Sequence, residues 1–339
     1  MALRIRPIEK RDEFQQAGPN DLVRLRPLPG RVPLVLPKKL LEVLCAAIVH
    51  AEFTHVSGPT GTAKTSLIES FYRVPENFRH VCASLGFPTL PLRVYPVEMA
   101  IYEAPGELWQ RRAVKDGTTY DEASALVRAL EDAGRHARSY RAIWLREIGR
   151  VHSASVQGGL LDLMSKGHVL LPDNSVLDVG GVAWIADSNY QAAQDSTHTL
   201  VTFDDALRRR FTVNLTLDYL GPEQEAEILR DVCRDMTQGT AHDDPAAEEW
   251  IEKLVQLAHV TRRHKAEGNL QSIAPPTFDS YFTALRLART LPHWSLDQIA
   301  QVSLFGNASA EDRKQVNAVL SEVLGLNIAE DADFPAELF

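Results

Sequence analysis

A glycine-rich segment at residues 58–65 has residue types and a spacing that could do chemistry. In order, the segment consists of Gly58, Pro59, Thr60, Gly61, Thr62, Ala63, Lys64 and Thr65. In a phosphate-binding loop, glycines let backbone N–H groups turn inward on a phosphate, a lysine contacts the β and γ oxygens, and a Ser or Thr hydroxyl binds Mg²⁺. The segment fits this pattern, although Ala63 stands where the pattern has its second glycine. We therefore predict that the segment binds the phosphates of a nucleotide and that Thr65 binds the metal.

The residues on either side of this segment predict the elements that such a loop requires. Phe53–Ser57 indicates a short strand, and the residues after Thr65 indicate a helix. Other apolar runs lack strict alternation, which is typical of strands covered on both faces of a mostly parallel sheet. These runs are Leu92–Val97, Ala142–Leu145, Val182–Ala186 and Thr212–Leu217. We expect an α/β fold, a P-loop parallel sheet with a hairpin at 168–179 around an Asp173-Asn174 turn.

The pattern changes from strands to helices after Tyr219. Apolar residues recur at helical spacing in four segments, which are 221–236, 245–268, 277–291 and 309–325. Gly221-Pro222 marks a turn between the two patterns. We expect an N-terminal arm at 1–35, an α/β domain at 36–221 and an all-α lid domain at 222–339 that ends in an acidic tail.

Composition limits the class of protein. The 339 residues are 45% hydrophobic, and the net charge of −9 disfavours contact with a nucleic-acid backbone. The strongest basic run, Arg262–Lys265, is short. Cys45, Cys82 and Cys233 are odd in number and widely spaced, which favours thiols in a reducing compartment. The sequence has no long apolar run and no signal-peptide pattern near Met1, so we expect a cytoplasmic protein without a membrane span.

These motifs together resemble the MoxR branch of the AAA+ ATPases, which includes the ATPase subunit of aerobic cobaltochelatase and activators of Rubisco and nitric oxide reductase. The resemblance extends from about Lys38 to Leu291. Its segments are GPTGTAKT, DEASALVRALEDAG, LREIGRVHSASVQGGLLDLMSKGHVLLPDNSV, WIADSNY and FDDALRRRF. The resemblance implies an AAA+ fold, ATP and Mg²⁺ as cofactors, and a hexameric ring that remodels a partner protein, often one with a von Willebrand A domain. The hairpin at 168–179 would face the pore or the partner.

The resemblance also implies roles for single residues. Glu147 is the candidate that polarises the attacking water, and Asn189 resembles the sensor 1 residue that orients this water. Arg210 matches the arginine that reaches the γ-phosphate of a neighbouring subunit, with Arg209 as the alternative. Simpler interpretations stay open, because an Asn often ends a strand and Arg208–Arg210 could be a solvated helix end.

Two positions depart from the family pattern. The family has an aspartate that helps to hold Mg²⁺ where this sequence has Arg146. Arg146 could pair with a neighbouring carboxylate, with Asp187 as first candidate, or contact the nucleotide phosphates, or belong to a site that binds nucleotide poorly. Within Ala274–Asp279, Pro276 or Thr277 occupies the place of the family's sensor 2 arginine. Both departures predict slow hydrolysis, because phosphoryl transfer depends on charge stabilisation and positioning.

The sequence therefore favours a ring-forming, MoxR-like AAA+ protein that binds ATP, hydrolyses it slowly and acts on a partner protein. A hydrolysis-deficient scaffold, in which bound ATP organises a larger complex, is the first alternative. A DNA-directed AAA+ regulator is the second, and the net charge of −9 weighs against it.

Overall fold

The computed structural model describes residues 5–7, 22–29, 31, 33–151, 153–166, 168–171, 174–189, 204–236, 245–270, 273–306 and 308–325. Residues 8–21 of the expected arm and the acidic tail from residue 326 lie outside this part of the chain. The described residues divide into two compact units. The described residues up to Leu217, apart from Pro59–Thr62, form the first unit, and those four loop residues with the described residues from Asp218 onward form the second.

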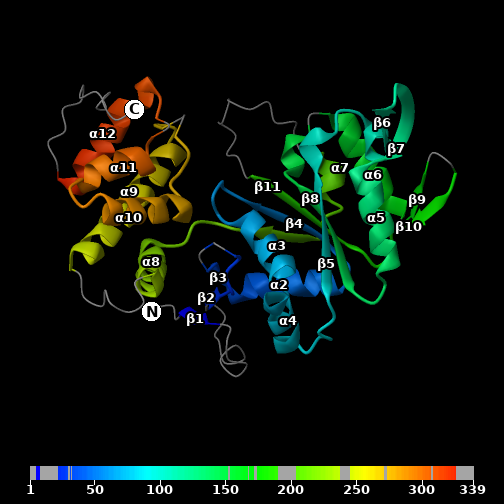
Figure 1. Cartoon of the computed structure of the whole chain (residues 1–339), viewed down its shortest axis with the longest axis horizontal. Helices are drawn as coiled ribbons and strands as arrows, with labels where there is room; N and C mark the ends of the chain where they lie inside the picture. Colours follow the sequence, from blue (N-terminus) through cyan, green and yellow to red (C-terminus); the bar gives the residue numbers. More distant parts are fainter. Residues whose placement is uncertain are drawn as a thin grey trace. The chain divides into compact units, whose positions relative to one another are not determined.

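A five-stranded parallel sheet forms the centre of the first unit (Figure 1). Its strands are β4 (Phe53–Gly58), β5 (Leu92–Glu98), β8 (Tyr140–Arg146), β11 (Ala183–Asn189) and β12 (Val213–Thr216). They lie in the order β12-β4-β11-β8-β5. The predicted strands and their parallel arrangement are confirmed, with small differences at the strand ends. The α/β fold class is therefore confirmed.

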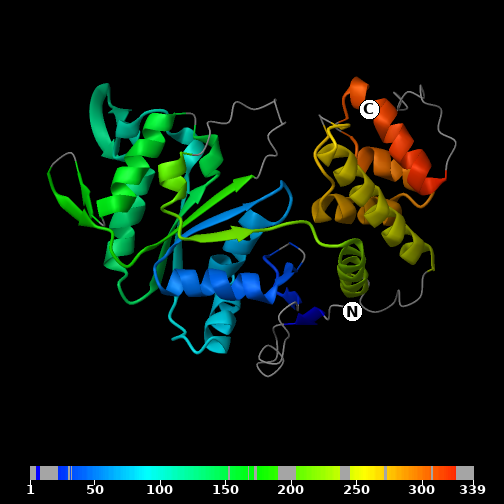
Figure 2. The ribbon, with the colours of Figure 1, turned by 180° about the vertical axis from the view of Figure 1, so that it is seen from behind.

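Helices cover both faces of this sheet (Figure 2). On one face lie α2 (Lys38–Val49), α3 (Lys64–Arg73) and α4 (Pro75–Ser84), and on the other α5 (Ala125–Arg135) and α6 (Ala154–Lys166). Successive residues of β8 point to opposite faces. Trp144 packs in one core with Leu67 of α3, and Ile143 packs in the other core with Leu126 of α5. This double burial explains why the central strands have apolar runs without alternation.

Smaller elements surround the sheet. The two strands of the hairpin at 168–179 are confirmed as β9 (His168–Leu170) and β10 (Val176–Asp178), whereas Asp173 of the predicted turn lies outside the described residues. A second hairpin that the sequence analysis did not anticipate consists of β6 (Gln110–Lys115) and β7 (Thr118–Ala123). The DEASALVRALEDAG segment is therefore helical only after Ser124, whose Oγ accepts a hydrogen bond from Val127 N at 3.0 Å and caps α5.

Short elements complete the first unit. A small sheet contains β1 (Ile5–Pro7), β2 (Leu22–Arg24) and β3 (Val35–Pro37), in which β2 pairs with both neighbours. The remaining helices are the single turns η1 (Met99–Ile101), η2 (Pro105–Leu108) and η3 (Ile148–Arg150), and α7 (Asp205–Arg208). The turn η3 follows β8 directly and therefore shapes the edge of the central sheet.

The second unit is helical. It contains α8 (Pro222–Met236), α9 (Pro245–Ala266), α10 (Phe278–Thr290), α11 (Leu296–Ser303) and α12 (Ala310–Leu324). The four predicted helices are confirmed, and α11 is an addition that is too short for a clear periodic pattern. None of the helices in the described ranges combines the length and the apolar character that crossing a lipid bilayer demands.

Candidate functional site

The segment 58–65 joins the end of β4 to the start of α3, as the sequence predicts. Gly61 has φ +83° and Ala63 has φ +66°, so both residues adopt the left-handed conformation. Ala63 is the N-cap of α3 and makes no side-chain cap hydrogen bond. The first N–H groups of α3 have no partner within the helix and are available to an anion. The preference for glycine at position 63 thus has a steric reason, because an L-residue in this conformation costs about 1–2 kcal/mol.

Lys64 lies folded back along this loop. Its Nζ donates a hydrogen bond to the carbonyl oxygen of Gly58 at 2.8 Å, and the residue is only 6% exposed. Burial lowers the pKa of Lys64 to about 8, against the opposing charges of Asp187 and Glu147. A phosphate would supply the counter-charge that a buried ammonium requires. The loop therefore fits a nucleotide, with Lys64 as the phosphate ligand and the half-buried Thr65 as the hydroxyl that would hold Mg²⁺.

Two further predicted residues lie at the sheet edge where this loop begins. Asn189 ends β11 and is the register partner of Gly58 on β4. Glu147 directly follows β8, the strand on the other side of β11, and has φ +51°. Its carboxylate forms an exposed ion pair with Arg150 at 3.2 Å. Because the carboxyl ends of parallel strands share one edge, the fold places Glu147 and Asn189 at the edge from which the loop leaves.

Arg146 pairs with a carboxylate, but the expectation that this carboxylate is Asp187 is wrong. Its guanidinium forms an ion pair with Glu98 at 3.3 Å and lies over the ring of Trp144 at 5.1 Å. Glu98 is the register partner of Arg146 on the adjacent strand β5, so the two side chains stand opposite each other. Arg146 therefore points toward β5, whereas the phosphate loop begins from β4 on the other side of β11.

Asp187 is a buried carboxylate that the sequence analysis did not assign to the site. It is 4% exposed, and its Oδ1 accepts hydrogen bonds from Trp144 Nε1 at 2.6 Å and from Glu147 N at 3.3 Å. Burial raises the pKa of Asp187 despite these two hydrogen bonds, with a further increase from the charge of Glu147 and a decrease from Lys64. The sequence signal for Asp187 is a single acidic residue at the end of the apolar run of β11.

Part of the chain is similar to proteins of known family. Residues 55–211 match the family model described as the AAA domain of the dynein-related subfamily. Over this range, which is just under half of the chain, the sequence is similar to an AAA domain. Among solved structures, the chain is similar to a "putative ATPase" from Cytophaga hutchinsonii, with 15% identity, coverage of 86% of this chain and 90% of that chain, and a TM-score of 0.39. No curated protein matches the chain.

The matched range includes the whole loop at 58–65, the edge residues Glu147 and Asn189, and Arg210. Arg210 follows α7, which Asp204 caps by accepting hydrogen bonds from the N–H groups of Ala206 and Leu207 at 2.7 and 3.2 Å. Leu207 anchors this turn in the core, and Arg208–Arg210 are all exposed. The candidate arginines therefore lie on the surface of the first unit.

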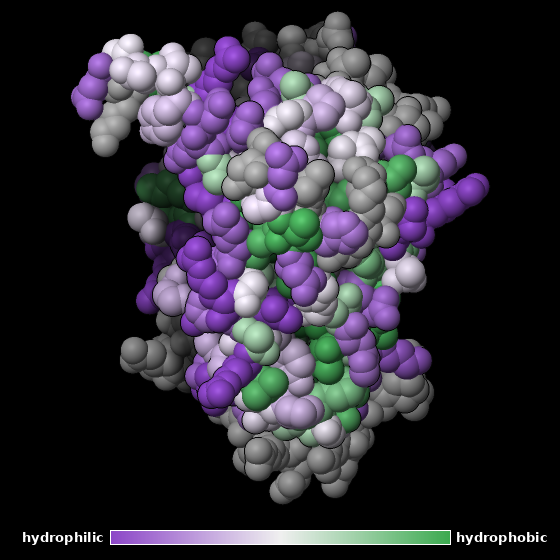
Figure 3. All heavy atoms as spheres, turned by 90° about the vertical axis from the view of Figure 1, so that its right-hand side faces the viewer, coloured by the Kyte–Doolittle hydropathy of each residue, from purple (hydrophilic) through white to green (hydrophobic). Residues whose placement is uncertain are grey.

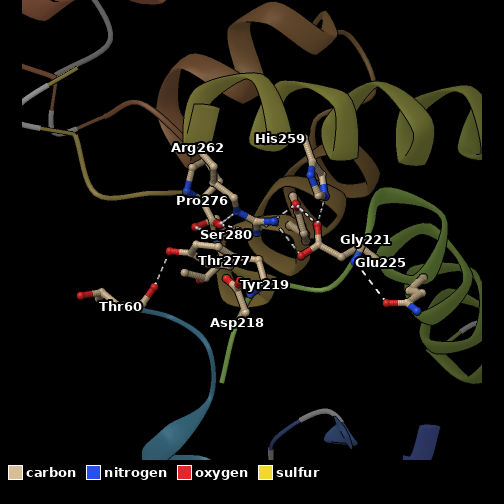
Figure 4. A network of polar contacts seen from close by, with 12 residues as sticks. Thr60, Asp218, Tyr219, Gly221, Glu225, His259, Arg262, Pro276, Thr277 and Ser280 are labelled. Carbon is tan, nitrogen blue, oxygen red and sulfur yellow. Dashed lines mark hydrogen bonds and ion pairs between the residues drawn. The ribbon is translucent and has the colours of Figure 1, made fainter. Parts of the chain in front are cut away.

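The helical unit contains a second buried carboxylate, Glu225, at the centre of the network in Figure 4. Glu225 is 1% exposed and accepts hydrogen bonds from Arg262 at 2.8 Å, Tyr281 at 2.6 Å and His259 at 3.1 Å. Burial would raise the pKa of Glu225, but the hydrogen bond from His259, the charge of Arg262 and the hydrogen bond from Tyr281 lower it. Arg262 is therefore a structural ion-pair partner, and the basic run that contains it is no free cationic surface.

The same network includes Thr60, one of the four loop residues that belong to the helical unit, as Figure 4 shows. The Arg262 guanidinium lies 4.0 Å from the centre of the Tyr219 ring, and Tyr219 donates a hydrogen bond to the carbonyl oxygen of Thr60 at 2.7 Å. A Cβ on Gly61 would lie 2.1 Å from Thr277 Cγ2. Thr277, at the place of the expected sensor 2 arginine, therefore packs on the loop with a methyl group and begins α10 as its N-cap.

Proposed function

We propose that the chain is a MoxR-like AAA ATPase that binds ATP with Mg²⁺, hydrolyses it slowly and uses it to act on a partner protein. The observation that supports this proposal most strongly is the conformation of the loop at 58–65. Left-handed residues precede the uncapped N-terminus of α3, and Lys64 is buried at the same place. Backbone N–H groups and a lysine in this arrangement suit the phosphates of a nucleotide better than any other common ligand.

Each edge residue has a defined task in this proposal. Lys64 and the loop N–H groups bind the phosphates, and Thr65 holds Mg²⁺, which would neutralise charge on the phosphate oxygens. Glu147 accepts a proton from the attacking water, and Asn189 orients this water. Hydrolysis is slow because position 146 carries a cation that is paired with Glu98, and because Thr277 has no charge to offer the γ-phosphate.

Exposed groups support assembly and action on a partner. Arg210 is exposed next to the anchored turn α7, where it can act on the nucleotide of a neighbouring subunit in a hexameric ring, with Arg209 as the alternative. Both hairpins of the first unit expose hydrophobic side chains, with Val114 72% and Val176 65% exposed. Such residues are suited to contact a partner protein, in this proposal one with a von Willebrand A domain. The face shown in Figure 3 carries small hydrophobic patches among hydrophilic residues.

Calorimetry and phosphate release together test the ATPase. We expect wild-type protein to bind ATP, Lys64→Ala to lose binding, and Glu147→Gln to bind ATP without turnover. Lys253→Ala is the matched control, because Lys253 forms an exposed pair with Glu249 on α9. Equal ATP affinity in wild type and Lys64→Ala, or no binding by either, would overturn the proposal.

Native mass and the mixing of two inactive variants test whether the chain assembles into a ring. Native mass should increase to that of a closed ring when ATP and Mg²⁺ are added. Lys64→Ala and Arg210→Ala are each expected to abolish turnover, whereas mixed rings should regain part of it, because some interfaces combine an intact loop with an intact arginine. The same mixture with Arg209→Ala identifies which arginine acts. A monomer under all nucleotide conditions would contradict assembly.

A nucleotide-binding scaffold without hydrolysis is the second candidate. The Arg146–Glu98 pair and the methyl contact of Thr277 favour it, because both remove charge stabilisation that phosphoryl transfer uses. Tight ATP binding and ring formation without measurable phosphate release, in wild type as in Glu147→Gln, would establish the scaffold and exclude the motor.

A further inference from the structure

The central sheet aligns three charged residues in one row at its carboxyl edge. Glu98 of β5 is the register partner of Arg146 of β8, and Asp187 of β11 is the register partner of Val56 of β4. The β8–β11 pairing ends at Leu145 with Ala186, so Arg146 and Asp187 are the next residues on their strands. Residues in one row of a sheet project from the same face. Val56 packs with Leu67 of α3, and the row therefore lies on the face covered by the helix that follows the phosphate loop.

The family pattern has a carboxylate at the position of Arg146 on β8, whereas this chain has its carboxylate one strand away, at Asp187 on β11. Arg146 turns toward Glu98 on β5, which is the outer strand. Asp187 lies on β11, next to the strand β4 from which the phosphate loop begins. The negative charge that position 146 lacks is thus present one strand nearer to the loop.

Only one of the two carboxylate oxygens of Asp187 accepts hydrogen bonds from the described residues. Both of its hydrogen bonds, from Trp144 Nε1 and Glu147 N, end on Oδ1, and among the described residues no hydrogen bond ends on Oδ2. The side chain is nevertheless 4% exposed. Oδ2 is not one of the fully buried polar atoms that lack a partner, so this oxygen is open to a cation or a water. Within the part of the chain that the structure describes, Lys64 of the loop is the one cation whose charge acts on Asp187.

We propose that Asp187 supplies the negative charge that favours Mg²⁺ at this nucleotide site, in place of an acidic residue at position 146. Through Oδ1 it also positions Glu147, since it holds the backbone N–H of that residue in the left-handed turn after β8. The inference rests on the proposed ATP binding and deepens it, because it states which carboxylate of this chain compensates for Arg146.

A purely structural role for Asp187 makes a different prediction. In that case the carboxylate serves only as acceptor for the indole N–H of Trp144 and for Glu147 N. Asp187→Asn keeps an acceptor oxygen in the place of Oδ1 and removes the charge. A structural role would therefore leave the metal dependence of nucleotide binding unchanged in this variant, whereas the proposed role would change it.

The test measures metal and nucleotide binding separately, without turnover. Mn²⁺ binding to the ADP complex is followed by electron paramagnetic resonance, and ADP binding in EDTA is followed by calorimetry. We expect Asp187→Asn to weaken Mn²⁺ affinity by about tenfold or more while ADP affinity in EDTA stays unchanged. Glu122→Gln is the matched control, because Glu122 of β7 pairs with Arg111 of β6 and Arg128 of α5, and it should bind Mn²⁺ as wild type does.

A double variant tests the displacement of the charge directly. Arg146→Asp in the Asp187→Asn background returns a carboxylate to the neighbouring strand and should recover most of the Mn²⁺ affinity. Unchanged Mn²⁺ affinity in Asp187→Asn would overturn the inference even if ATP binding holds, whereas loss of all nucleotide binding in wild type would overturn the proposed function itself. A variant Asp187→Asn that fails to fold would also contradict it, because removal of a charge that burial disfavours should not destabilise the fold.

Discussion

The two buried carboxylates, Asp187 in the sheet unit and Glu225 in the helical unit, are equally hidden but differently surrounded. Glu225 receives an arginine, a tyrosine and a histidine, and its pKa is lowered. Asp187 receives two hydrogen bonds on one oxygen from uncharged donors, and its pKa is raised. Burial is thus compensated inside the protein at Glu225 and only partly compensated at Asp187.

This difference distinguishes the structural role of Glu225 from the role in the site that we propose for Asp187. Glu225 has partners on both oxygens, and these partners connect α8, α9 and α10 within the helical unit. Asp187 accepts both of its hydrogen bonds on Oδ1, and it lies on β11, the strand next to β4 from which the phosphate loop begins. Buried polar groups that lack a full set of partners persist where a ligand completes them. The following variants test this contrast.

The largest effect is expected for Glu225→Gln. The change leaves Arg262 buried without its counter-charge, and the free energy of unfolding should fall by about 3 kcal/mol. Because the folded pKa of Glu225 is lowered, its stabilising contribution is present above the unfolded pKa and is lost as the pH falls through the folded pKa. Urea unfolding at several pH values measures both effects. Glu249→Gln, at an exposed pair with Lys253, is the control and should change little.

Asp187→Asn should show a smaller effect of opposite sign. The folded pKa of Asp187 is raised, so the ionised carboxylate disfavours the folded state increasingly as the pH rises from the unfolded pKa through the folded pKa. Asp187→Asn removes the ionisable group, so the free energy of unfolding of the variant should exceed that of wild type as the pH rises. Thermal unfolding from about pH 4 to about pH 8 provides the measurement. A loss of stability like that of Glu225→Gln would remove the contrast between the two carboxylates.

Ala63→Gly should stabilise the protein slightly. Ala63 has φ +66°, and removal of the strain of this left-handed conformation stabilises the folded state by about 1–2 kcal/mol. Glycine offsets about 0.5–1 kcal/mol of this gain, because it raises the conformational entropy of the unfolded chain. We expect a net gain of up to about 1 kcal/mol in urea unfolding. Ala129→Gly within α5 is the control and should instead cost about 1 kcal/mol. Destabilisation by both variants to the same degree would argue against the loop conformation.

Glu98→Gln should have the smallest effect. The Arg146–Glu98 pair has side chains that are 38% and 37% exposed, and such pairs contribute about 0–1 kcal/mol. The free energy of unfolding should change by less than about 0.5 kcal/mol in urea unfolding at low salt. A change as large as that of Glu225→Gln would show that solvent does not screen the Arg146–Glu98 pair at this edge of the sheet. It would also support a larger role for Arg146 in the site.

Much of the fold could be predicted because its signals are local. The central strands are recognisable in the sequence as apolar runs, and the loop at 58–65 is recognisable by its glycines and its Lys-Thr pair. The β6–β7 hairpin was missed because its strands are largely exposed and polar, and so lack the hydrophobic pattern from which strands are predicted. The partner of Arg146 was predicted wrongly because strand register, which sets Glu98 opposite it, is not visible in the sequence.

The sequence by itself determined the kind of fold and the phosphate loop, since hydrophobic periodicity and glycine placement act over a few residues. Only the tertiary structure decided which charges meet. Lateral pairing of β5, β8 and β11 put Glu98 and Asp187 on either side of Arg146, and helix packing put Arg262 on Glu225. Electrostatic partners far apart in the chain depend on register and burial, and these arise only when the elements pack.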